Sequence, residues 1–373
     1  MKQTILFQLK SLTLTHEPEA LPDVKEAIAK TILGNPGGIQ YRQRDALKKV
    51  KEIKPLHFFP LRKNGKLLLV MALAERITYN ENRAYYTYYV RYVSFNPAFT
   101  VKSLTHSNSS QSLYRIGNSF MKEGMKKHAE NFAFTLKDSN ADASKKIYYA
   151  YVEESNIRSL NFTEFFFEKI RDFTIITYSN LFPHPDRRVL KIQVSDLDRM
   201  TRILENEYLH HSFFFLEKEK LLSDYYVLKE NDEILTGVQA RITNWKIEEL
   251  PGITGKIIKN ILPYVPLLSR FIKPGRFTFL TFDTMYCTNG NEHLIPLLFR
   301  AVCAILNVYA GMIYIDSKDP LCARIRNLRN MGFLNRVYKN AKGVLVTRFV
   351  NFTDKEKQEF IDHPVYISGY DLT

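Results

Sequence analysis

The chain has 373 residues, of which 45% are hydrophobic, 25% charged and 13% aromatic. That balance is typical of globular domains and excludes a largely disordered chain, and the length fits two domains of ordinary size. The formal net charge of +14 is uneven: residues 1–150 carry 24 Lys and Arg against 12 Asp and Glu, residues 151–250 carry 13 against 18, and residues 251–350 carry 14 against 4. Two basic blocks around an acidic one predict surfaces that attract nucleic acid, anionic membrane or phosphorylated ligands, unless the charge serves solubility alone.

The three cysteines, Cys287, Cys303 and Cys322, are too few and too widely spaced for a disulfide framework or a zinc site, which favours a reducing compartment. The first ten residues are too polar for the apolar region of a signal peptide, and no apolar run approaches the ~18 residues that span a bilayer. We therefore expect a soluble, cytoplasmic protein.

The first half of the chain alternates strand and helix patterns. Asn64-Gly65 between two apolar runs is a strong hairpin signal. The expected elements are a strand at 4–9, a helix at 23–32, a hairpin at 56–77, a strand at 84–95, a helix at 117–130, a strand at 147–153, a helix at 157–167 and a strand at 173–178.

The second half repeats this order, and two prolines, Pro183 and Pro185, mark the boundary between domains 1–185 and 186–373. Its hairpin turn is Asn231-Asp232. The expected elements are a strand at 189–194, a helix at 196–210, a hairpin at 225–242, a strand at 277–286, a helix at 292–307, a strand at 312–316, a helix at 321–331 and a strand at 344–349.

The repeat extends to single residues, because 151–159 aligns with 314–322. Both segments open with an aromatic, a β-branched and an acidic residue. Asn156 and Asp319 then stand at equivalent places, where we expect each to cap the following helix. The pattern predicts a duplicated chain.

This order of elements resembles the GNAT superfamily of acyl-CoA-dependent N-acyltransferases, present twice in tandem over nearly the whole chain. The resemblance implies an α/β (α+β) fold with a mixed, splayed sheet and helices on both faces. It also implies that acyl-CoA lies in the cleft where two parallel strands part.

The most specific motif of the family is a Gln/Arg-x-x-Gly-x-Gly/Ala loop before a helix, whose backbone N–H groups hold the pyrophosphate of CoA. Each half keeps one glycine of it, so the resemblance implies cofactor-binding residues Gly290, Asn291 and Glu292 in the second half and Arg115, Gly117, Asn118 and Ser119 in the first. Glu292 would place a carboxylate where a phosphate belongs, unless it caps the helix. An alternative alignment of the first half on 95–97 puts Ser103 and Thr105 at the glycine positions.

The general acid of the family is commonly a Tyr shortly before a Gly-Phe pair. The second half keeps Gly332-Phe333, but neither 157–172 nor 320–333 contains a tyrosine. On the long strand, Asp283 and Tyr286 are the catalytic candidates, although Asp283 alternates with apolar residues and could equally face solvent. The histidines show no ligand spacing, and no metal site is expected.

Residues 253–274 form an apolar and basic segment with no acidic residue. The segment could line the groove of an acyl or lipid-like substrate, rest on an anionic membrane surface, or pack as a buried arm.

The sequence thus predicts an N-acyltransferase that transfers the acyl group of acetyl-CoA or another acyl-CoA to a small-molecule or peptide amine. The second half would bind CoA, and the first would be a pseudo-domain completing the acceptor cleft. The alternative is a non-catalytic protein that binds acyl-CoA or another anionic partner. Nucleic acid is not expected, because no recognition motif supports it. The acyl group, the acceptor and the oligomeric state are left open.

Overall fold

The structure is a computed structural model. It describes residues 3–34, 37–96, 135–154, 156, 159–160, 163–164, 166–252, 255, 259–266, 268–273, 275–337 and 341–373. The strands are β1 (Thr4–Leu9), β2 (Leu12–His16), β3 (Leu33–Gly34), β4 (Gln40–Gln43), β5 (Leu56–Lys63), β6 (Lys66–Asn80), β7 (Arg83–Phe95), β8 (Ala141–Glu153), β9 (Glu168–Ser179), β10 (Val189–Lys191), β11 (Tyr225–Glu230), β12 (Glu233–Glu249), β13 (Ile272–Lys273), β14 (Arg276–Cys287), β15 (Ala310–Asp316) and β16 (Lys342–Val350). The α-helices are α1 (Pro22–Lys30), α2 (Ala46–Glu52), α6 (Leu197–Glu207), α7 (Lys218–Asp224), α9 (Ile295–Leu306), α10 (Pro320–Arg326), α11 (Phe333–Val337), α12 (Asp354–Asp362) and α13 (Gly369–Leu372).

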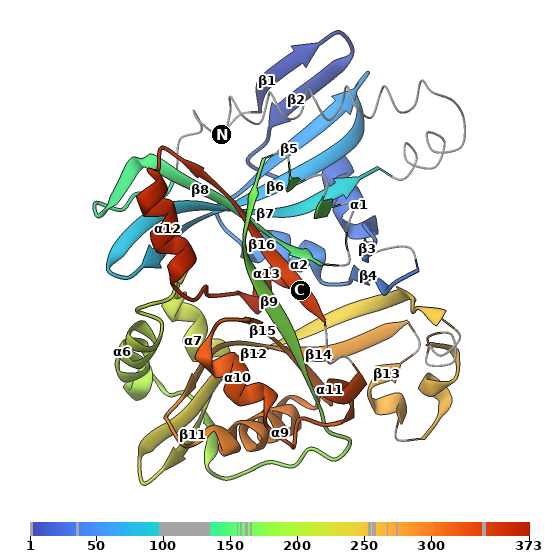
Figure 1. Cartoon of the computed structure of the whole chain (residues 1–373). Helices are drawn as coiled ribbons and strands as arrows, with labels where there is room; N and C mark the ends of the chain where they lie inside the picture. The colour runs from blue at the N-terminus through green and yellow to red at the C-terminus, as the bar shows by residue number, and fades with distance from the viewer. Residues whose placement is uncertain are drawn as a thin grey trace.

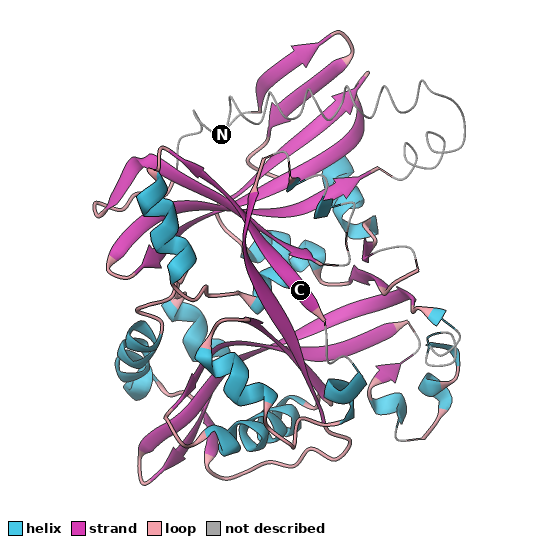
Figure 2. Ribbon diagram, in the orientation of Figure 1, coloured by secondary structure: helices cyan, strands magenta, loops and turns pink. Residues whose placement is uncertain are grey.

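The sixteen strands of the described residues form one mixed sheet with helices against it (Figures 1 and 2). Its main path runs β1-β2-β5-β6-β7-β8-β16-β9-β15-β14-β12-β11-β10. Among the pairs of described strands, β7–β8 and β14–β15 are parallel and the others are antiparallel. The expected mixed α/β fold is confirmed.

The two parallel pairs have the same local geometry. In each, the first strand of the pair carries an extra residue against its antiparallel neighbour: β7 opposite Val70 and Ala72 of β6, and β14 opposite Gly237 and Gln239 of β12. A residue with positive φ lies in each bulge, Tyr92 at 53° and Thr284 at 43°. The bulges therefore place Arg91 of the first half and Asp283 of the second at equivalent positions of the register.

Strands of the two halves are interleaved at the centre of the sheet. β9 precedes the expected boundary at 185/186, yet it pairs with β15 and β16 of the second half. β16 in turn pairs with β8 of the first half. The two halves therefore share one sheet, and the boundary stays a prediction about the chain.

Both hairpin turns form as expected. Asn64 and Gly65 have φ of 49° and 76°, and Asn231 and Asp232 have 49° and 64°, the backbone that a two-residue hairpin requires. Gly332 is explained by a close approach, because a Cβ there would lie 2.0 Å from the carbonyl oxygen of Ser179. The helix expected at 117–130 lies outside the described residues, as does part of the one expected at 157–167.

Residues 363–373, which we call the tail, run through the middle of the molecule after α12 (Figure 1). Asp371, whose side chain is fully buried, accepts hydrogen bonds from both terminal nitrogens of Arg76 and lies 3.6 Å from Nη1 of Arg91. Arg91 also donates to the carbonyl oxygens of Tyr370, at 3.2 Å, and Thr373, at 2.9 Å. The tail thus neutralises buried charge of the first half.

We predict that Asp371→Asn lowers the free energy of unfolding by about 3–5 kcal/mol, because it leaves two buried guanidinium groups without a carboxylate. Urea unfolding monitored by circular dichroism measures the change. Glu26→Gln is the matched control: it breaks the Glu26–Lys30 pair, whose side chains are 64% and 60% exposed, and should change stability by less than about 1 kcal/mol. Equal effects of the two changes would refute the role given to Asp371.

Candidate functional site

A cleft opens where β14 and β15 part. The two strands pair only from Leu280 to Phe282 on β14 and from Gly311 to Ile313 on β15. Beyond that point lies a small cleft that is partly open to solvent. The polar side chains that line it are those of Tyr208, His211, Asp283, Thr284, Tyr314, Asp316, Asp319 and Tyr366.

Asp283 lines this cleft and holds the tail. Its Oδ1 accepts hydrogen bonds from the Tyr366 hydroxyl at 2.7 Å and the Thr284 amide at 2.8 Å. Its Oδ2 accepts from the Ser368 hydroxyl at 3.2 Å and the Tyr370 amide at 3.3 Å. Burial raises the pKa of Asp283, and the hydrogen bond from Tyr366 opposes that rise. The side chain is 7% exposed and does not face solvent.

Asp316 holds the same segment one strand further along. One carboxylate oxygen accepts from the backbone amide of Val365 at 2.7 Å, and the other accepts from that of Lys318 at 2.8 Å. The guanidinium of Arg171 lies 3.2 Å away. Burial is the main cause that raises the pKa of Asp316.

A histidine and an aspartate meet at the mouth of the cleft. Nε2 of His211 lies 3.0 Å from Oδ2 of Asp319. The other oxygen of Asp319 accepts from the amide of Leu321 at 2.7 Å and so caps α10, as expected. Asn156 accepts from the Ser159 amide at 3.0 Å in the equivalent place. The cap of α10 thus presents a carboxylate to the cleft.

The corresponding region of the first half is cationic. Arg76 and Arg91 both lie against the carboxylate of Asp371. Lys49, on α2, donates to the carbonyl oxygen of Thr373, and burial is the main cause that lowers its pKa to about 7. Basic side chains thus lie around the parting strands of the first half, and acidic side chains lie around those of the second.

The expected phosphate loop of the second half already holds a carboxylate. Gly290 has φ of 86° and open space around it. Asn291 donates from its side chain to the Thr288 hydroxyl at 2.8 Å, and Glu292 begins a short helical turn (Glu292–Leu294) before α9. The backbone N–H groups of Glu292 itself and of Gly290, together with Arg324 at 2.6 Å, lower the pKa of Glu292. An internal anion thus occupies this helix start.

The other predicted site residues are not brought to the cleft. Tyr286 is half-buried among the side chains around α6 and does not line the cleft. Arg115, Gly117, Asn118 and Ser119 lie outside the described residues. These assignments stay predictions.

Sequence reasoning missed His211, Asp316, Tyr366 and the tail. Asp319 was identified only as a helix cap. The sequence feature that could have identified Asp316 is its alignment with Glu153. No sequence feature pointed to the tail.

The comparison with known structures concerns the fold. The yeast N-myristoyltransferase (Saccharomyces cerevisiae) with bound myristoyl-CoA aligns over 93% of this chain and 85% of its own, with a TM-score of 0.55 and 7% identity. A second structure of the same protein with bound myristoyl-CoA aligns over 98% and 87%, with a TM-score of 0.55 and 8% identity. The chain has a GNAT-like fold. No protein-family model and no curated protein matches the sequence.

Part of the apolar and basic segment 253–274 lies outside the described residues. In the remainder, Ile261 and Tyr264 are exposed, whereas Phe271 is buried beside Phe333. Contact of this segment with a membrane surface stays a prediction. No helix in the described ranges is long and apolar enough to cross a membrane.

We predict that Asp283→Asn loosens the tail. In the wild-type chain both carboxylate oxygens accept hydrogen bonds, whereas the NH₂ group of asparagine would face some of the same donors and could not accept from them. Hydrogen exchange read by mass spectrometry should show faster exchange across 365–372 and unchanged exchange in α9. Asp232→Asn, at the exposed β11–β12 turn where Asn tolerates positive φ, is the control. Unchanged protection of the tail in Asp283→Asn would exclude an anchoring role.

Proposed function

We propose that the protein is an acyl-CoA-dependent N-acyltransferase and that its amine acceptor binds in the cleft between β14 and β15. The observation that carries the proposal is the set of carboxylates in this cleft, Asp283, Asp316 and Asp319, within an acyl-CoA N-acyltransferase fold. An amine arrives in water as an ammonium ion, and carboxylates in a partly enclosed cleft attract a cation.

The same charges oppose a polyanion, which supports placing the CoA phosphates in the first half. Glu292 fills the helix start at which the second half was expected to bind pyrophosphate. The arginines Arg76 and Arg91 lie around the first parting strands. We therefore propose that the first half, with Arg115 and Gly117, binds the acyl-CoA.

In the proposed reaction, the ammonium ion loses a proton to a carboxylate of the cleft, and the neutral nitrogen attacks the thioester carbon. A C–N bond forms and the C–S bond breaks, and the nitrogen gives up a second proton as it becomes an amide. CoA leaves as a thiolate that takes up this second proton. Backbone N–H groups at the parting strands would polarise the carbonyl. The alternative proposal, a protein that binds acyl-CoA without turnover, differs only in the absence of this transfer.

The first test measures transfer itself. With an acyl-CoA series from acetyl to myristoyl and a panel of amines and N-terminal peptides, we expect release of free CoA thiol above the rate without protein. Mass spectrometry identifies the acylated amine. Tight CoA binding without turnover on any acceptor would establish the binder instead, and neither binding nor turnover would overturn both proposals.

A matched pair of glycine substitutions locates the phosphates. Val in place of a glycine in such a turn obstructs the approach of phosphate to backbone N–H groups. We expect Gly117→Val to weaken CoA binding by at least tenfold in calorimetry and Gly290→Val to leave it unchanged. The reverse result would move the cofactor to the second half, as the sequence suggested.

Asp319→Asn tests the acceptor site. Asn caps a helix about as well as Asp, so α10 should stay intact while the negative charge is lost. We expect the KM for the amine to rise several-fold and the Kd for CoA to stay the same. A KM equal to that of the wild-type protein would show that Asp319 does not contribute to the acceptor site. That result would leave the proposal that the first half binds CoA unaffected.

A further inference from the structure

Three segments that are far apart in sequence join at one corner of the molecule: the β6–β7 turn, the loop after α6 and the start of the tail. The Tyr79 amide donates to the carbonyl oxygen of Phe214 at 2.7 Å. The Ser212 amide donates to that of Pro364 at 2.8 Å, and the Tyr366 amide donates to that of Ser212 at 2.9 Å. Backbone hydrogen bonds thus fix the three segments relative to one another.

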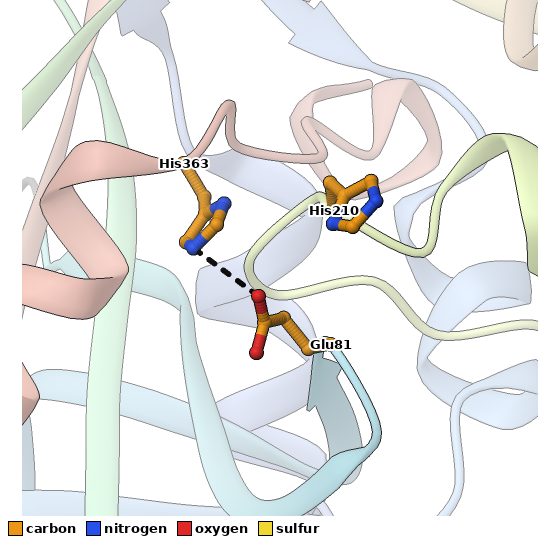
Figure 3. A group of neighbouring side chains, drawn as sticks. All are labelled: Glu81, His210 and His363. Atoms are coloured by element: carbon orange, nitrogen blue, oxygen red, sulfur yellow. Dashed lines mark ion pairs between the residues drawn. The ribbon is translucent and has the colours of Figure 1, made fainter.

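Each of these segments presents one side chain with a metal-ligand atom at the outer edge of the junction (Figure 3). They are Glu81, His210 and His363, and one ligand atom from each lies within 4.8 Å of the others. Nε2 of His363 is 3.6 Å from Oε1 of Glu81. The two imidazole rings are nearly parallel, with an interplanar angle of 14° and centroids 6.3 Å apart.

The contacts within the described residues leave both rings available. His363 has its side-chain ion pair only with Glu81, and no side-chain hydrogen bond to His210 occurs there. An exposed ion pair of this kind contributes little by itself. The ion pair between Glu81 and His363 does not explain why the imidazole of His210 lies near that of His363. A cation bound by all three side chains would explain it.

We propose that Glu81, His210 and His363 bind a divalent zinc ion, with water at the remaining position. In tetrahedral zinc, bonds of about 2.0–2.1 Å put neighbouring ligand atoms roughly 3.4 Å apart. The observed 3.6 Å between His363 and Glu81 matches that spacing. His210 is exposed, and its ligand atom lies within 4.8 Å of the other two, so the proposed site requires this side chain to move closer when the metal binds.

Two imidazoles and a carboxylate suit zinc and the neighbouring transition metals rather than magnesium or calcium, which prefer oxygen ligands alone. The backbone already holds the three segments together, so little order has to be gained on binding. Because the ligands meet only in the folded chain, the metal stabilises the folded state.

The position gives the metal a structural consequence. His363 is the first residue of the tail, which supplies Asp371 to the buried arginines and Tyr366 to Asp283. A zinc ion here would clamp the start of the tail to both halves. This inference does not depend on the proposed acyl transfer.

The test uses the full chain, stripped of metal with EDTA and dialysed. Calorimetric titration with ZnCl₂ should show one site per chain with a micromolar or lower Kd, and MgCl₂ should show none. Co²⁺ in place of zinc should give the visible absorption of a tetrahedral site. Anomalous diffraction at the zinc edge should place the ion between the three side chains.

Three variants and a matched control complete the experiment. We expect His210→Ala, His363→Ala and Glu81→Gln each to weaken zinc binding at least tenfold and to abolish the zinc-dependent rise in Tm. The control is His184→Ala, which changes an exposed histidine in the loop between the halves. This variant should bind zinc with the same affinity as the wild-type chain. Tm values measured without metal verify that the variants fold.

The proposal is overturned by the absence of zinc binding to the wild-type chain, or by binding that all three variants retain. An anomalous peak elsewhere, for example at the buried Cys287, Cys303 or Cys322, overturns it as well. Because the wild-type chain alone gives the stoichiometry and the peak position, a variant that fails to fold does not leave the proposal undecided.

Discussion

The buried carboxylate of Asp371 neutralises two largely buried guanidinium groups, and the arrangement of the two halves depends on this contact. Arg76 and Arg91 stand on neighbouring strands of the first half, and without a counter-charge their burial would cost several kcal/mol each. The carboxylate comes from 295 positions further along the chain. The fold is therefore complete only when the tail has entered between the halves.

The entry of the tail explains why the second-half cleft has its present form. Tyr366 and Ser368 bind Asp283, and the Val365 amide binds Asp316, so the two parting strands are connected by the segment that crosses between them. Interleaving of β9 and β16 connects the halves a second time through the sheet. Neither half of this chain could be removed without exposing the strand edges and charges that the other covers.

Local sequence patterns correctly predicted the features that depend on neighbouring residues alone, such as turns, helix caps and strands. The hairpin turn at Asn64-Gly65, the cap at Asp319 and most strands lie where they were expected. Asp283 was harder, because the alternation left open whether this catalytic candidate faces solvent. In the structure the bulge at Thr284 shifts the phase of the strand, and the tail covers Asp283. The tail itself left no signal, since its hydrogen bonds to the rest of the chain join residues that are between 49 and 324 positions apart, from Val365–Asp316 to Thr373–Lys49, and its short helix has no periodic apolar face.

The equivalence of Arg91 and Asp283 gives the duplication a chemical meaning. A reaction between a polyanionic acyl donor and a cationic amine needs two neighbouring environments of opposite sign, and a chain that uses one bulged architecture twice can provide them by changing one residue at the same register position. In the proposed arrangement, Glu292 at the helix start of the half with the acidic cleft would repel the phosphates of the donor and leave that half to the amine. Because the tail touches both environments, with Asp371 in one and Tyr366 in the other, the two reactants of the proposed transfer would meet beside it.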